Sequence, residues 1–383
     1  MNAVAQPRVR PVRWSRVAAF RLARHHLVDR TSADLVKVCR DVCGIQAQVM
    51  SSAAMACWTR MPGITPDAIH SALWKRRTLI RTSCMRQTLH LLPSDDFSIY
   101  IAALKRSRLA ALMRGMARFG MTAKDVDALN GLVMEALRSG PRSQRDLTVE
   151  IRPKLNKRIQ AWMERFWSIF RPAVVEGLIC YGPEAGGEAG KRSDVVFVRV
   201  DQWLPKHKEV DELHAQQILL RGYLRSYGPA TVQDFSFWSG ISMKESREIW
   251  NSLASETADV SIEGSKMSIL CRDLQELADS HLDEQSVRLL PGFDPYLLAH
   301  AKKDHMVSDR RYKRVYRNQG WITPVILVDA RIAGIWSFVK KGKTLSLQAE
   351  LFEKSPKSLR TRIHDEAASL GKFLNTSVSV ELS

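Results

Sequence analysis

The same succession of elements is expected three times along this chain: two or three helices followed by a pair of short strands. In the first copy, Pro66 stands in the first turn of a helix whose apolar face carries Ile69 and Leu73. Residues 79–82 and 87–92 then read as two strands. Helices followed by a hairpin are typical of a winged helix. The repeated pattern therefore predicts a mixed α+β chain built from several small units.

The second copy has helices expected over residues 126–137 and 162–176, with Ser143 opening a further helix between them. Its two strands are expected at 179–181 and 195–198. The loop between these strands contains GGEAGKRS, which looks like a phosphate loop. Ala185 stands where the first glycine of that motif is needed, and Arg192 follows Lys191 where Ser or Thr is required. We therefore interpret this loop as the tip of a wing.

The third copy opens with a helix near Gln216, turns at Tyr227-Gly228-Pro229 into a second helix, and continues after Gly240 into a third. Its strands are expected at 260–262 and 267–270. Beyond residue 288 the pattern changes to strands at 325–328, 332–336, 344–347 and 378–380, with one helix at 358–370.

These patterns divide the chain into five expected parts. They are a basic N-terminal extension (1–13), a first winged helix with a linker helix (14–121), a second winged helix (122–205), a third winged helix (206–275) and a C-terminal β-rich domain (276–383).

The charge balance indicates a polyanionic partner. The 383 residues include 58 Lys and Arg against 40 Asp and Glu, a formal net charge of +18. Clustered cations gain affinity for nucleic acid by releasing counterions condensed on the phosphates, although a basic surface can also serve solubility alone. No apolar run reaches the roughly 18 residues of a membrane helix, so no membrane partner is expected. With six scattered cysteines and no secretory segment, a cytoplasmic protein associated with the nucleoid is expected.

A metal site is not expected. Cys39 and Cys43 could join His25 or His26 around a metal ion, but no second cysteine pair completes the spacing of a structural zinc site. Two cysteines on one helical face are ordinary core residues. The sequence also lacks the common zinc-protease, serine-hydrolase and dinucleotide-binding motifs, and no cofactor is implied.

Two segments stand out as candidates for function. The first is Gly44-Ile45-Gln46-Ala47-Gln48, in which two glutamines flank a small residue; surface glutamines of no function are the alternative. The second is residues 290–296, followed by a basic stretch that either contacts phosphates or forms a solvated helix face. Its basic residues are Lys302, Lys303, Arg310, Arg311, Lys313, Arg314 and Arg317.

These segments and several others resemble one family, the AlkZ-like winged-helix DNA glycosylases, which also include the bacterial YcaQ-like proteins. The resemblance extends over most of the chain. Its matching pieces are residues 44–48, 85–91, 227–231, 290–296, 320–325 and 328–334. Some relatives, the YcaQ-like branch, carry Asp at the second position of the motif, so with Gln48 this chain looks like the AlkZ branch. Two positions depart from the family: Gln87 and Ala330 stand where many members have glycine.

The resemblance implies three tandem winged helices and a β-rich, barrel-like C-terminal domain enclosing a concave DNA channel. It implies a monomeric hydrolase of N-glycosyl bonds in base excision repair, acting on double-stranded DNA that carries alkylated purines or interstrand crosslinks. The catalytic residues would be Gln46 and Gln48. Arg86 and His90 would contact DNA or the lesion, and Arg331 would probe the minor groove from a hairpin tip. For His90 a hydrogen-bonded structural role is the alternative, and for Arg331 an ordinary exposed turn.

Glutamine is compatible with this chemistry. A neutral amide is no general base, but it can orient a water, and a purine alkylated at N7 or N3 is already a cationic leaving group. The i,i+2 spacing of Gln46 and Gln48 requires a non-helical or helix-start conformation, which Gly44 permits. The main alternative function is a winged-helix DNA-binding regulator or architectural protein without catalysis. An RNA-binding protein is disfavoured because the known RNA-binding signatures are missing.

Overall fold

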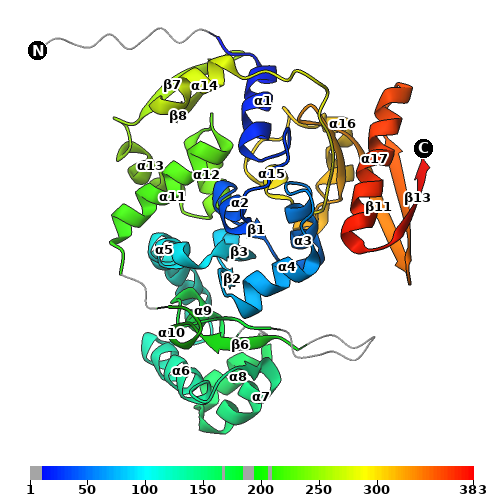
Figure 1. The fold of residues 1–383 in the computed structure, drawn as a ribbon. Coiled ribbons are helices and arrows are strands. Elements are labelled where there is room, and N and C mark those ends of the chain that lie inside the picture. Colours follow the sequence, from blue (N-terminus) through cyan, green and yellow to red (C-terminus); the bar gives the residue numbers. More distant parts are fainter. Residues whose placement is uncertain (1–10, 166–168, 184–193, 206–208) are drawn as a thin grey trace, which may run out of the picture. The chain divides into compact units, whose positions relative to one another are not determined.

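The computed structural model describes residues 11–165, 169–183, 194–205 and 209–383 (Figure 1). By its internal contacts the chain divides into two compact units. Unit 1 comprises Met1–Ile69, Leu220–Trp238 and Met243–Ser383, and unit 2 comprises His70–Leu219 and Ser239–Ser242. This partition differs from the expected succession of domains, whose boundaries stay a prediction.

Unit 2 contains the hairpin of the first group and the whole of the second helix-and-hairpin group. Its elements are β2 (Leu79–Ser83), β3 (Leu89–Pro93), α5 (Phe97–Ala117), α6 (Ala123–Ala136), β4 (Arg142–Ser143), α7 (Gln144–Ile151), α8 (Lys157–Arg165), α9 (Arg171–Val175), β5 (Ile179–Tyr181), β6 (Val196–Arg199) and α10 (Val200–Trp203). The expected hairpins are confirmed as the antiparallel pairs β2–β3 and β5–β6.

Local capping explains where two of these helices begin. Thr122 precedes α6 and forms a capping box with Asp125, each side chain bonding the other residue's backbone N–H. Ser143 precedes α7 and accepts a hydrogen bond from the backbone of Asp146, as its position in the sequence predicts. The helices bury Val126, Leu129 and Leu147 in one apolar cluster with residues of β5 and β6.

The two hairpins of unit 2 belong to one sheet. The strands β3, β2, β5, β6 and β4 follow one another in that order in a single sheet, because β2 pairs with β5 in antiparallel register at Arg81 and Tyr181. The tip of the second hairpin, residues 184–193, lies outside the described residues, and so does its interpretation as a wing tip. The number of winged-helix domains stays a prediction.

Unit 1 combines the N-terminal helices, the third group and the C-terminal sheet. Its elements are α1 (Trp14–Arg24), α2 (Leu35–Asp41), β1 (Ile45–Gln46), α3 (Met50–Trp58), α4 (Pro66–His70), α11 (Glu212–Tyr227), α12 (Val232–Ser239), α13 (Met243–Asn251), β7 (Thr257–Ile262), β8 (Ser265–Leu270), α14 (Leu274–Asp279), β9 (Val287–Leu290), α15 (Pro295–Leu298), α16 (Asp309–Val315), β10 (Val325–Val328), β11 (Arg331–Lys341), β12 (Thr344–Leu351), α17 (Lys357–Leu374) and β13 (Ser377–Leu382). The helices α4 and α12 each have their last residue in unit 2, and the first half of α11 belongs to unit 2. The hairpin β7–β8 is antiparallel as expected.

The C-terminal sheet is open, so the expected barrel-like closure is wrong. Its strands lie in the order β13-β12-β11-β10-β9, which leaves β13 and β9 at the two edges. β12 and β13 are parallel, and α17 makes the crossover that parallel neighbours require (Figure 1). Since α17 packs against β9 and β13, the helix covers one face of the sheet instead of a further strand closing it.

An apolar cluster on this sheet includes Leu22, Leu27, Val325 and Leu327. Of the expected N-terminal extension, residues 1–10 lie outside the described part, and Val12 forms a parallel bridge to Ile262. Among the described residues, no helix is both long and apolar enough to span a bilayer.

Candidate functional site

The segment that carries both glutamines leaves the helical conformation where the sequence predicts. Cys43 and Gly44 have positive φ angles of 53° and 91°, which end α2, and the chain then extends through β1. Gln46 is buried and Gln48 is exposed just before α3 begins at Met50. The backbone is therefore non-helical at both glutamines, as their spacing requires: Gln46 ends β1 and Gln48 lies in the bend that leads to α3.

The end of α11 fixes the chain just before this segment. The Tyr227 hydroxyl donates to the carbonyl of Val42 at 2.8 Å, and the Ser226 hydroxyl donates to the carbonyl of Asp41. The Cys43 thiol lies 3.3 Å from the same Ser226 hydroxyl. Three consecutive residues before Gly44 are therefore held by two buried side chains, which sets the direction in which β1 leaves α2.

A second tie involves Asp41. Its carboxylate contacts Nε2 of His26 at 2.9 Å and Nζ of Lys37 at 2.6 Å. Burial alone would raise the pKa of Asp41, but these two hydrogen bonds hold the pKa below its usual value. The carboxylate is thus ionised and structural at neutral pH.

The cysteines considered as metal ligands have other contacts. Cys39 lies against Cys57, and this contact together with burial raises the pKa of Cys39 well above its usual value. The Cys43 thiol faces Ser226 instead. In the part of the chain that the structure describes, no three His, Cys, Asp or Glu side chains are grouped as metal ligands would be.

Arg86 occupies a tight turn in unit 2. Both Arg86 and Gln87 have positive φ angles, 52° and 63°, between the strands β2 and β3. The turn is closed by a hydrogen bond from the Cys84 N–H to the Thr88 carbonyl at 2.9 Å. Gly240 lies so close that a Cβ there would stand 3.2 Å from the backbone of Arg86. The family's usual glycine after Arg86 matches a backbone conformation that glycine adopts most easily.

His90 is buried on β3, and its Nδ1 donates to the carbonyl of Thr88 at 2.9 Å. Burial lowers its pKa to about 3, and the positive charges of Arg86 and Arg108 lower it further. A neutral ring that uses its N–H inside the protein corresponds to the structural alternative named for this residue, and the expected contact with phosphate or lesion finds no support in this geometry.

The basic stretch divides into engaged and exposed residues. Lys303 is buried, and its ammonium donates to the carbonyl of Leu297 at 2.9 Å, so the phosphate contact expected at Lys303 stays a prediction that this burial does not favour. Arg314 forms a bidentate pair with Glu350, and Arg310 pairs with Glu353 at 2.7 Å. Arg311 donates to the Phe352 carbonyl. The exposed residues are Lys302, Arg310, Lys313 and Arg317.

Arg331 is exposed at the hairpin between β10 and β11, as expected. The two-residue loop consists of Asp329 and Ala330, both with positive φ (47° and 66°), which is the backbone of a type I′ turn. The Asp329 carboxylate accepts a hydrogen bond from the Ser286 backbone N–H at 2.7 Å and anchors the turn. Ala330 thus holds the conformation for which the family's usual glycine is suited.

Residues 290–296 have a structural role that the sequence did not reveal. Asp294 caps α15 by accepting from the Tyr296 N–H, and it forms a bidentate ion pair with Arg60 at 2.7 and 2.8 Å, both side chains fully buried. A Cβ on Gly292 would stand 2.6 Å from the Ile322 carbonyl oxygen. This motif therefore maintains the core of unit 1.

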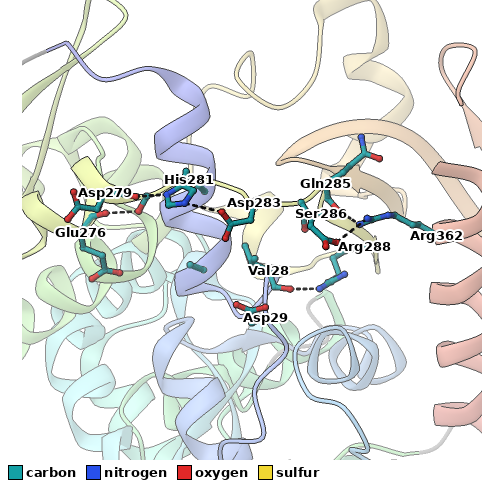
Figure 2. A pocket seen from close by; sticks show the side chains of 14 residues that line it. Val28, Asp29, Glu276, Asp279, His281, Asp283, Gln285, Ser286, Arg288 and Arg362 are labelled. Carbon is teal, nitrogen blue, oxygen red and sulfur yellow. Dashed lines mark hydrogen bonds and ion pairs between the residues drawn. The ribbon is translucent and has the colours of Figure 1, made fainter. Parts of the chain in front are cut away.

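The hollow shown in Figure 2 has the wrong charge for a phosphate polymer. It has a volume of about 670 Å³ and is lined by α1, α14 and the segment leading into β9. Its carboxylates include Asp29, Glu276, Asp279 and Asp283, and Figure 2 shows His281 and Arg362 in contacts with neighbours of the same lining. This hollow therefore does not mark the site.

Comparison with known proteins now bears on the glutamine segment. A family model described as "DNA glycosylase AlkZ-like" matches residues 39–373, a span that includes both glutamines, the Arg86 turn and the β10–β11 hairpin. The chain belongs to the AlkZ-like DNA glycosylase family. Its resemblance to that family, first seen in short motifs, is confirmed over most of its length.

Similarity in sequence and in structure agrees with this assignment. An interstrand DNA cross-link repair glycosylase from Streptomyces sahachiroi is 30% identical over 334 residues, which are 85% of this chain and 88% of the relative. The solved structure of the Streptomyces sahachiroi DNA glycosylase AlkZ superimposes with a TM-score of 0.83 at 26% identity and covers 98% of this chain and 100% of that one. The mixed helix-and-sheet fold of this chain therefore matches that of the solved structure.

The sequence missed the residues that hold the glutamine segment in place. Ser226 and Tyr227 bond to the backbone of residues 41 and 42, which are far away in the sequence. A local signal in this region is the Tyr227-Gly228-Pro229 motif, which the sequence predicts to form a turn. Its turn role is real, since a Cβ on Gly228 would stand 2.4 Å from the Leu224 carbonyl oxygen.

Proposed function

We propose that this chain hydrolyses the N-glycosidic bond of alkylated purines in double-stranded DNA, including purines joined in an interstrand crosslink. Membership of a DNA glycosylase family supports the reaction, and the name of the 30% identical relative supports the crosslinked substrate. The single observation that carries the site is the break in the helix at Gly44, which puts Gln46 at the end of β1 and Gln48 in the bend before α3, so neither side chain has the diverging direction that a continuous helix would give it.

In this mechanism the two glutamines position the attacking water. Each amide offers a carbonyl that accepts from a water and an NH₂ group that donates, without a proton to exchange at neutral pH. Purines alkylated at N7 or N3 carry a positive charge, so the C–N bond breaks with little acid assistance and the sugar becomes cation-like. Orientation of the water and dipolar stabilisation of that sugar cation are then sufficient. Rigid support from Ser226 and Tyr227 keeps the segment in position.

For the proposed reaction, DNA contacts are assigned to cations that are exposed or half-buried. They are Arg331 at the hairpin tip and the exposed side chains Lys302, Arg310, Lys313 and Arg317, with the half-buried Arg86 in its turn. Arg311 and Arg314 are less suited, since each already bonds within unit 1. We further propose that the protein acts as a monomer on the cytoplasmic nucleoid.

The decisive experiment measures base release under single-turnover conditions. The substrates are a duplex with one N7-alkylguanine and a duplex with one N7–N7 crosslink. Wild type is expected to release base from both, and the double variant Gln46→Ala/Gln48→Ala to lose release at matched DNA binding. The variant Gln348→Ala removes one exposed glutamine of β12 and serves as the control. Full activity of the double variant would refute the role of the glutamines; binding without release by wild type would favour a non-catalytic DNA-binding protein.

A further inference from the structure

A group of arginines in unit 2 surrounds Tyr181 and plays no part in the proposed reaction. Arg81 of β2 stands directly across from Tyr181 of β5, so the two side chains share a face of the sheet. The guanidinium carbon of Arg81 lies 5.8 Å from the centre of the Tyr181 ring. Ser83 is two residues along β2 and belongs to the same face.

Two helices bring further arginines to this place. Arg108 of α5 donates from Nη2 to the Ser83 hydroxyl at 2.8 Å. Arg171 begins α9, which packs against β2, β5 and α5. Burial raises the pKa of Tyr181, whereas the positive charges of Arg81, Arg171 and Arg108 lower it. All three guanidinium groups are therefore close enough to the Tyr181 hydroxyl for their charges to affect it.

Arg108 is the member that lacks compensation. Its side chain is 5% exposed, and in the described part of the chain its Nε and Nη1 atoms are buried without a hydrogen-bond partner. Burial and the charge of Arg171 both lower the pKa of Arg108. Nearby Cys84 does not supply a negative charge, because burial raises its thiol pKa to about 12.

The guanidinium group of arginine stays protonated in proteins, so a buried arginine keeps its positive charge. This charge must be compensated by an anion or by several hydrogen-bond acceptors. Tetrahedral oxyanions with several acceptor oxygens match the fork of N–H donors that arginine presents. We propose that Arg81, Arg108 and Arg171 form a binding site for a phosphate group, with Nε and Nη1 of Arg108 as its innermost donors.

Access to this arginine cluster comes from its outer members. Arg171 and Tyr181 are partly exposed, while Arg81 and Arg108 lie deeper. A phosphate could be a backbone phosphodiester of duplex DNA, in which case the site rests on the proposed function, or it could be free inorganic phosphate. The chemistry of recognition is the same, and experiment separates the two sources.

The first arm uses inorganic phosphate alone. Thermal unfolding of the full chain is followed with increasing phosphate against chloride at equal ionic strength. Wild type is expected to show a saturable increase in Tm as phosphate is added. Arg108→Met is expected to show no such increase when its Tm values with and without phosphate are compared, even if this variant is less stable from the start. Arg118→Met, which removes an exposed charge at the end of the same helix, keeps the increase. If Arg108→Met does not fold, Arg171→Met replaces it because Arg171 is partly exposed.

The second arm measures binding of undamaged duplex DNA against salt concentration. Loss of one phosphate contact lowers the slope of log K against log salt by about 0.9. A lower slope in Arg108→Met or Arg171→Met, but not in Arg118→Met, assigns the site to the DNA backbone. A lost phosphate response with an unchanged slope assigns it to free phosphate.

The proposal is overturned if phosphate gives wild type no saturable stabilisation and these substitutions leave the DNA slope unchanged. Neither arm involves base release, so this result is distinct from a failure of the glycosylase assay.

Discussion

Breaking the buried pair of Arg60 and Asp294 should be among the most destabilising changes to unit 1. Both side chains are fully buried and joined by two hydrogen bonds of 2.7 and 2.8 Å. Removing one partner leaves the other charge in the interior, which costs about 3–5 kcal/mol of unfolding free energy. We therefore expect about this loss for Arg60→Met and again for Asp294→Asn, which keeps an oxygen to cap α15.

The double variant tests the reasoning more sharply than either single change. If the two single changes were additive, the double variant would lose about 6–10 kcal/mol of unfolding free energy. Because it leaves no charge in the interior, we expect its loss to be at least 3 kcal/mol smaller than that sum. These unfolding free energies of unit 1 can be measured from the urea dependence of hydrogen exchange in peptides from α3 and α15. As a matched control, Glu350→Gln breaks the bidentate but partly exposed pair with Arg314 and should lose about 1 kcal/mol or less. Additive losses in the double variant would refute the argument.

Three further outcomes are expected. Acidification from pH 7 to pH 5 should lower the unfolding free energy by about 2 kcal/mol for each of the buried rings of His90 and His305. In the unfolded chain both rings have a pKa near 6.5, whereas burial lowers the folded pKa to about 3 for His90 and about 2 for His305, so the unfolded state binds more protons over this range. Urea midpoints measured against pH check this, and His90→Gln should make the midpoint depend less steeply on pH. Gln87→Gly should stabilise the protein by up to about 1 kcal/mol, because relief of the left-handed backbone strain at this position exceeds the entropy that glycine adds to the unfolded chain. Gln275→Gly, in the helix α14, should instead destabilise the protein by about 1 kcal/mol. Thermal unfolding of the two variants checks both expectations. Gln48→Asp should retain base release but gain an acid limb in its pH–rate profile near pH 4, and a profile like that of wild type would contradict the water-positioning role.

The sequence predicted individual elements well because local patterns determine them. The strand expected at 325–328 is β10, and Ser143 caps α7 as its position indicates. Pairing between distant segments has no such local signal. One pair, Arg81 with Tyr181, joins two hairpins into a single sheet although 100 residues separate them. Closure of the C-terminal sheet failed as a prediction for the same reason, since strand order depends on where α17 packs.

For the candidate site, the sequence located the glutamines and their non-helical backbone but not their support. Gly44 indicated a break in the helix, whereas the hydroxyls that hold the break come from α11. Charge composition indicated a basic stretch but could not separate its members. Only the fold shows that Lys303 turns inward and that Arg314 meets Glu350.

The discontinuity of unit 1 affects how the chain is made. Arg60 and its partner Asp294 are 234 residues apart. At the roughly 5–20 residues per second of protein synthesis, about 10–50 s pass between the appearance of the cation and that of its anion. Unit 2 is nearly contiguous and is complete on the ribosome well before Asp294 is translated. Until the C-terminal sheet emerges, the N-terminal helices and the glutamine segment therefore cannot complete the core of unit 1. During this time their apolar residues are accessible to chaperones and proteases.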